Sequence, residues 1–274
     1  MLYAQGSMAG CSTALRYAAG GWKVARALAV GDTVFVPCSR IEGLDRTGVS
    51  LYRSEVVEVG RSKVRVSLAG GSVSDWIGAS LVHKSVGILL LNIGDFETEQ
   101  TLLDPLAKSV TQFCRLLVPD DQVRAVRVRS LEELRRLWER EQGAYSHVVW
   151  IGHGSETGIH FGVGDWVDAE TLGKTLRVRG APRKVYISLC CKTGYKSFGS
   201  TLSRTTMCSR FLGPFHSVEG AVASQFCQTF LTAHLLEGRT VGVAFRKARS
   251  SVPGSTSFRL WTAGRLTAGP RASG

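Results

Sequence analysis

Two unbroken apolar runs, each followed at once by a reactive side chain, constrain the fold of this chain most strongly. Residues 147–154 read HVVWIGHG, and residues 184–194 read KVYISLCCKTG. Strands buried on both faces of a parallel α/β sheet have such unbroken apolar sequences, and ligands collect beyond their carboxyl ends. If the two strands are neighbours, about 4.8 Å apart, then His153 faces a thiol of Cys190 or Cys191 at that edge.

The pattern of strands and helices changes near residue 85. Residues 22–84 contain short alternating runs separated by glycines, which predict a small antiparallel β module similar to an SH3-type barrel. In residues 85–262 apolar strands alternate with amphipathic helices, which predicts a three-layer α/β sandwich around a mostly parallel sheet. We expect a flexible arm at residues 1–21 and a disordered tail at residues 263–274. The β module is either an extension packed on the main domain or a regulatory, ligand-binding unit.

Composition narrows the classes of function and of partner. The 274 residues are 44% hydrophobic and 20% charged, as expected of a soluble globular protein. The net charge is +12, but the basic residues are dispersed among acids up to Glu237 and no nucleic-acid motif is visible, which disfavours a nucleic-acid partner. Seven cysteines without a disulfide framework or zinc spacing favour the reducing cytoplasm and predict no metal or other cofactor. No apolar run is long enough to span a membrane.

The histidine and the cysteines suit nucleophilic catalysis. A cysteine attacks as its thiolate, and a neighbouring imidazole both withdraws the proton and lowers the thiol pKa. Gly154 has no side chain, so its backbone N–H and that of the cysteine can form an oxyanion hole, in which each donor is worth about 3 kcal/mol. The alternative is that His153 only caps a strand and that both cysteines are core residues, as free cysteines usually are.

Two of these segments match known signatures. Residues 151–154 (IGHG) and 188–194 (SLCCKTG) resemble the His-Gly and Cys-x-Thr-Gly signatures of the CHAT family of caspase-like cysteine peptidases. Histidine precedes cysteine, as in that family, and the resemblance extends over residues 85–261. It implies a caspase-like fold and a cysteine endopeptidase whose catalytic dyad is His153 and Cys191.

The resemblance has further implications. It makes Cys190 an inert, buried thiol of raised pKa, and Gly154 and Cys191 the oxyanion-hole donors. It implies protein substrates, an activating sensor protein or a small nucleotide signal, and a regulated role in bacterial defence or cell death. A catalytically silent module of the same family, which binds a ligand or partner, is the alternative function.

The sequence gives weaker indications about substrate binding. Leu189 stands where caspases carry a glutamine of the specificity pocket, so cleavage after aspartate is not implied. Asp95 and Asp165 follow strand ends on the catalytic side and predict a basic residue before the cut, the alternative being that they only shape a loop and a hairpin. We expect residues 192–215 to be flexible before activation and to form part of the substrate groove.

Overall fold

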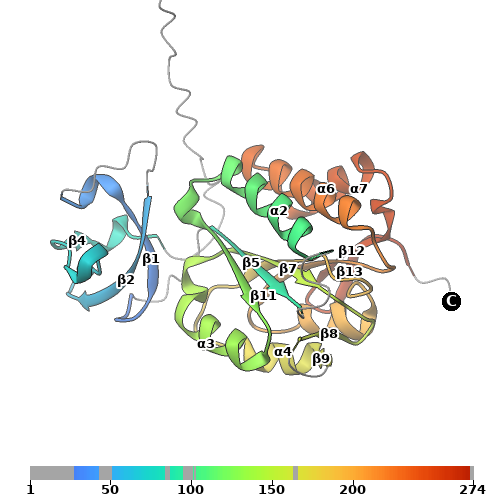
Figure 1. Cartoon of the computed structure of the whole chain (residues 1–274), viewed down its shortest axis with the longest axis horizontal. Helices are drawn as coiled ribbons and strands as arrows, with labels where there is room; N and C mark the ends of the chain where they lie inside the picture. The colour runs from blue at the N-terminus through green and yellow to red at the C-terminus, as the bar shows by residue number, and fades with distance from the viewer. Residues whose placement is uncertain are drawn as a thin grey trace, which may run out of the picture.

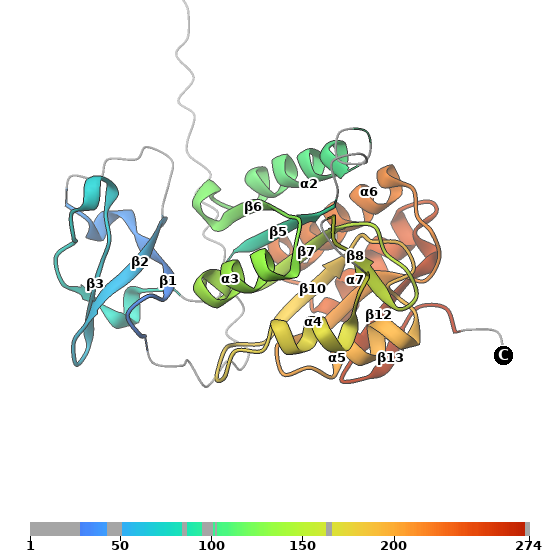
Figure 2. The same ribbon diagram turned by 60° about the horizontal axis from the view of Figure 1, so that its bottom comes forward.

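The structure is a computed structural model. It describes residues 28–42, 51–83, 87–94, 101, 103–162 and 166–271. Figures 1 and 2 show a small β unit beside a larger α/β unit. The predicted arm, residues 1–21, lies outside the described residues, as do Asp95 and Asp165.

The small unit is a four-stranded antiparallel sheet in the order β1-β2-β3-β4. Its strands are β1 (Thr33–Pro37), β2 (Leu51–Val59), β3 (Lys63–Val66) and β4 (Ile77–Gly78), and its 3-10 turns are η1 (Cys38–Arg40), η2 (Ala69–Gly71) and η3 (Ala79–Leu81). Alternate valines, among them Val34, Val36, Val64 and Val66, point inward and form a separate core. The antiparallel sheet expected here is present, while its likeness to an SH3 barrel stays a prediction.

The larger unit is built on a seven-stranded sheet in the order β13-β12-β11-β10-β7-β5-β6. The strands are β5 (Ile88–Ile93), β6 (Val123–Val128), β7 (His147–Gly152), β10 (Lys184–Ser188), β11 (Cys208–Pro214), β12 (Phe258–Thr262) and β13 (Arg265–Ala268). The five strands from β6 to β11 are parallel to one another, whereas β12 and β13 are antiparallel to their neighbours. The prediction of a mostly parallel central sheet is confirmed.

Helices cover both faces of this sheet (Figure 2). One face is covered by α2 (Asp104–Leu117), α6 (Gly220–Leu231) and α7 (Val241–Ser251), and the other by α3 (Leu131–Glu141), α4 (Ala169–Thr175) and α5 (Thr201–Ser203). Shorter elements are the hairpin β8 (Gly158–His160) and β9 (Trp166–Asp168), the 3-10 turns η5 (Asp120–Gln122), η6 (Gln142–Ala144) and η9 (Ser255–Ser257), and the π turns η7 (Lys196–Ser200) and η8 (Thr232–Leu236). Each face has its own apolar core, so the unit has three layers. No helix within the described ranges has both the length and the apolar sequence needed to cross a membrane.

The helix boundaries follow from local chemistry. Ser130 caps α3, because its hydroxyl accepts a hydrogen bond from the N–H of Glu133 at 3.2 Å. Helix α2 begins at Asp104, so that Pro105 lies in its first turn, where the missing N–H costs nothing.

Two predictions about irregular segments are wrong. Residues 192–215, expected to be flexible before activation, contain a π turn, a short helix and the central strand β11, while their part in a substrate groove stays a prediction. The tail expected from residue 263 forms strand β13, which pairs with β12 through residue 268. Ala263 and Gly264 link these strands with φ of 48° and 81°, the left-handed pair that tight hairpin turns need.

Candidate active site

His153 follows β7 directly and is partly exposed at the carboxyl edge of the sheet. Its carbonyl accepts a hydrogen bond from the N–H of His160 at 3.0 Å, and Gly154 forms an isolated β-bridge with Ile159. Strand β8 therefore holds the histidine segment in an extended conformation beyond the end of β7.

The two cysteines follow β10, which is the parallel neighbour of β7. The prediction that these two strands are neighbours is confirmed, because Trp150 of β7 lies opposite Ser188 of β10. Beyond the paired residues the chains touch: a Cβ built on Gly154 would lie 2.5 Å from the carbonyl oxygen of Cys191 and 2.8 Å from Cβ of Cys190. Only glycine permits this approach, so the sequence places a glycine where the two reactive segments meet.

A compact turn follows the cysteines. The Thr193 hydroxyl donates a hydrogen bond to the Cys190 carbonyl oxygen at 2.9 Å, and it lies within hydrogen-bond distance of the Ser188 hydroxyl, at 2.8 Å. The Gly194 N–H donates to the carbonyl of Pro214 on β11 at 2.7 Å, and the Gly194 carbonyl accepts from the indole N–H of Trp261 on β12 at 3.0 Å. The turn is thus fixed from three strands.

Lys192, the residue after Cys191, has a left-handed backbone with φ of 59°. For a residue other than glycine this conformation costs about 1–2 kcal/mol. Its N–H donates to the carbonyl of His216 at 3.3 Å, and its Nζ lies 3.8 Å from a carboxylate oxygen of Glu156. These contacts hold the strained residue in place and tie the loop after β10 to the loop after β7.

The two cysteines have different environments. Cys190 is fully buried in the core on the side of the sheet that α3, α4 and α5 cover, and burial raises its pKa to about 12. Cys191 is partly exposed, and its Sγ lies 3.8 Å from the carbonyl oxygen of Val218. The prediction that Cys190 is a buried thiol of raised pKa is confirmed, which leaves Cys191 as the accessible thiol beside the histidine segment.

The backbone N–H groups of Gly154 and Cys191 make no hydrogen bond within the described part of the chain. Unbonded backbone N–H groups are the kind of donor that an oxyanion hole uses. Across the described ranges no cluster of three or more His, Cys, Asp and Glu side chains is placed to hold a metal ion.

The structure describes only one of the three residues that were expected to bind substrate. Leu189 is only 3% exposed and packs in the core beneath α2 and α6, so its assignment to a specificity pocket is wrong. The parity of β10 explains this, since Leu189 points to the face opposite Cys190. Asp95 and Asp165 lie outside the described residues.

Sequence reasoning missed three residues at this site. Glu156 reaches Lys192, while His216 and Val218 bring the end of β11 alongside Cys191. The strand β11 is the sequence feature that could have indicated His216 and Val218. Residues 215–218 follow the carboxyl end of this strand, which is a parallel neighbour of β10, and functional residues collect at such strand ends.

Comparison with known proteins adds one structural likeness. No protein-family model matches this chain, and no curated protein matches it. A secreted C11 cysteine protease from Bacteroides thetaiotaomicron, called iotapain, is similar in structure, with a TM-score of 0.44 and 9% sequence identity. The match covers 66% of each chain, so this chain spans just under two thirds of that protein's length.

Proposed function

We propose that this chain is a caspase-like cysteine endopeptidase in which Cys191 is the nucleophile and His153 the general base. The observation that carries the proposal is the backbone contact between Gly154 and Cys191, which brings the residue next to the histidine against the backbone of the accessible cysteine. The buried Cys190 is excluded from this role, because a nucleophile must reach its substrate and ionise.

The proposed reaction has two steps. The imidazole of His153 takes the proton of the Cys191 thiol, and Sγ attacks the carbonyl carbon of the substrate peptide bond. The imidazolium then gives its proton to the leaving amine as the C–N bond breaks, which leaves an acyl group on sulfur as a thioester. Water, deprotonated by the same imidazole, hydrolyses the thioester and restores the thiol.

The negative oxygen that forms in each step needs hydrogen-bond donors. The N–H groups of Gly154 and Cys191, which make no hydrogen bond within the described structure, supply them in this proposal. Removing one donor of an oxyanion hole costs about 3 kcal/mol in other enzymes.

The finer assignments rest on the sequence motifs. The His-Gly and Cys-x-Thr-Gly segments support a placement in the CHAT family, with protein substrates, control by a sensor protein or small nucleotide signal, and a role in bacterial defence or cell death. The six described cysteines are all free thiols, which supports a reducing compartment such as the cytoplasm. A preference for a basic residue before the cut, drawn from Asp95 and Asp165, is tested with fluorogenic peptides that carry Lys, Arg or Leu at that position.

Alkylation of the intact protein tests the dyad. With limiting iodoacetamide at pH 7, Cys191 becomes the dominant labelled residue in peptide mass spectrometry, and His153→Ala slows its labelling because less thiolate forms. His160→Ala is the matched control, since this histidine lies on the adjacent strand β8 and its ring contacts Trp166. Equal labelling rates in the two variants, or peptide hydrolysis that survives Cys191→Ala, contradict the proposal.

A further inference from the structure

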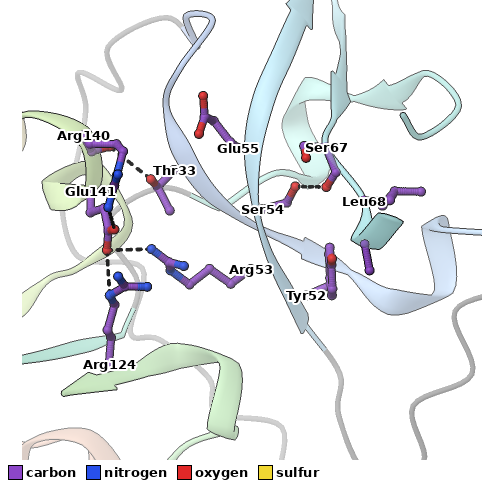
Figure 3. A pocket seen from close by; sticks show the side chains of 11 residues that line it. Thr33, Tyr52, Arg53, Ser54, Glu55, Ser67, Leu68, Arg124, Arg140 and Glu141 are labelled. Carbon is purple, nitrogen blue, oxygen red and sulfur yellow. Dashed lines mark hydrogen bonds and ion pairs between the residues drawn. The ribbon is translucent and has the colours of Figure 1, made fainter. Parts of the chain in front are cut away.

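A pocket of about 350 Å³ lies where the small β unit meets the α/β unit (Figure 3). Arg53 and Ser54 of β2 line it from one side, and Arg124 of β6 with Arg140 and Glu141 of α3 line it from the other. Its size falls within the range of small-molecule sites, roughly 300–1,000 Å³. Arg124 belongs to the amino-terminal half of β6, so the pocket lies toward the edge of the sheet opposite the candidate active site.

The centre of this pocket is a buried carboxylate surrounded by arginines. The Glu141 side chain is only 3% exposed, and its oxygens lie 2.6 Å from Arg53, 2.9 Å from Arg124 and 2.7 Å from Arg140. A buried carboxylate needs a cationic partner, but one guanidinium in good geometry satisfies it. Three guanidinium groups around one carboxylate leave a local excess of positive charge.

Arg53 and Arg124 differ in the hydrogen bonds that their N–H groups make. Arg53 donates hydrogen bonds to both Glu141 and the Tyr145 hydroxyl, at 2.6 and 2.9 Å. The Nε of Arg124, in contrast, is buried and has no hydrogen-bond partner among the described residues, although it lies near Glu141. Figure 3 shows the heads of Arg53 and Arg124 next to one another beside the carboxylate. Two guanidinium groups converge on one carboxylate oxygen, and no hydrogen bond to the terminal nitrogens of Arg124 is present among the described residues, so these nitrogens can donate to a second anion.

The remaining walls are mostly polar. Ser54 and Ser67 are joined by a hydrogen bond from the Ser54 hydroxyl to the Ser67 carbonyl, and the Tyr52 side chain lies farther along the same strand. Leu68 and Ala69 add a small apolar surface. Glu55, an exposed residue, also lines the pocket, so a ligand must place its anionic group toward Arg53 and Arg124.

We propose that this pocket binds a small molecule with a phosphate or carboxylate group, held by the guanidinium groups of Arg53 and Arg124 and by contacts with both units. Planar guanidinium forks match both anions in two-point geometry. Because the ligand contacts the β unit and the α/β unit together, its binding also strengthens their association. None of these residues takes part in the proposed peptidase chemistry, so the two proposals fail or succeed separately.

Isothermal titration calorimetry on the full chain tests the site, with inorganic pyrophosphate and citrate as the phosphate and carboxylate probes at matched ionic strength. We expect one or both to bind with one-to-one stoichiometry and to raise the melting temperature. Arg124→Gln weakens binding at least tenfold. Arg136→Gln, an arginine on α3 that pairs with Glu132 outside this pocket, leaves the dissociation constant within twofold.

A charge-preserving variant guards against a folding defect. Arg124→Lys keeps a cation beside Glu141 but loses the planar fork, so it retains the wild-type far-ultraviolet circular dichroism and still binds several-fold more weakly. The proposal is overturned if neither anion binds the wild-type protein, or if the Arg124 and Arg136 variants bind equally well.

Discussion

Replacing Gly154 with alanine tests whether the two reactive segments must touch for the site to form. The new Cβ would lie 2.5 Å from the Cys191 carbonyl oxygen and 2.8 Å from Cβ of Cys190. Comfortable contacts between such atoms are about 3.5 Å, so the two backbones must separate by about 1 Å. Gly154 does not have a left-handed φ, so the expected effect comes from this collision alone.

This displacement sets the size of the effect. Overpacking of this kind costs about 1–3 kcal/mol of stability, and a displacement of about 1 Å between reacting groups lowers turnover by about 100-fold. Gly154→Ala therefore melts several degrees below the wild type, and its kcat/KM on a fluorogenic peptide falls about 100-fold. Alkylation of Cys191 slows in the same variant, because the displacement separates the two residues of the proposed dyad.

A second glycine provides the control. A Cβ on Gly242 in α7 would meet only a terminal nitrogen of Arg246, at 3.7 Å, so Gly242→Ala retains full activity and the wild-type melting temperature or slightly more. Wild-type turnover and an unchanged melting temperature in Gly154→Ala refute the contact between the two strand ends, and with it the reasoning behind the proposed dyad.

Three further predictions concern the two cysteines, the Thr193 hydroxyl and the buried Lys184. Cys191→Ala abolishes peptide hydrolysis, whereas Cys190→Ala keeps most of it and loses about 1 kcal/mol of stability in urea denaturation. Thr193→Val costs about 1–3 kcal/mol in the same assay because the hydroxyl partner of Ser188 is lost, and Thr193→Ser restores it. Burial lowers the pKa of Lys184 to about 7, so between pH 7 and 10 this residue binds more protons in the unfolded chain and contributes a rise of the free energy of unfolding with pH, by up to about 1.4 kcal/mol per unit. Lys184→Met removes this contribution, and equal pH slopes in the variant and the wild type contradict the assignment.

The parts of the fold that local sequence determines were predictable. Strands β7 and β10 are mostly apolar because helices cover both faces of the sheet, and Ser130 caps α3 by a hydrogen bond within the first turn of the helix. Strand β11 was not predictable in this way, because its first half carries Ser209 and Arg210 and resembles a loop. It becomes a central strand only through pairing with β10 and β12, which lie far from it or after it in the chain.

The candidate site, too, could be predicted from the sequence only in part. The proximity of residues 153–154 to the cysteines follows from two neighbouring strand ends, which a single sequence can indicate. The approach of Val218 to Cys191 depends on where the chain runs after β11, and no short motif records that path. The assignment of Leu189 to a specificity pocket came from its position in a family motif. The alternation of side chains along its own strand instead directs Leu189 into the core.

The turn after Cys191 also has a consequence for protein synthesis. Its carbonyl at Gly194 is held by Trp261, 67 residues later in the sequence, and the proposed catalytic thiol acquires its final surroundings only after β12 has left the ribosome and paired. At about 5–20 residues per second, several seconds pass between translation of the cysteine and completion of its turn. A nascent chain therefore carries Cys191 for several seconds without the hydrogen bond from Trp261 that completes its turn.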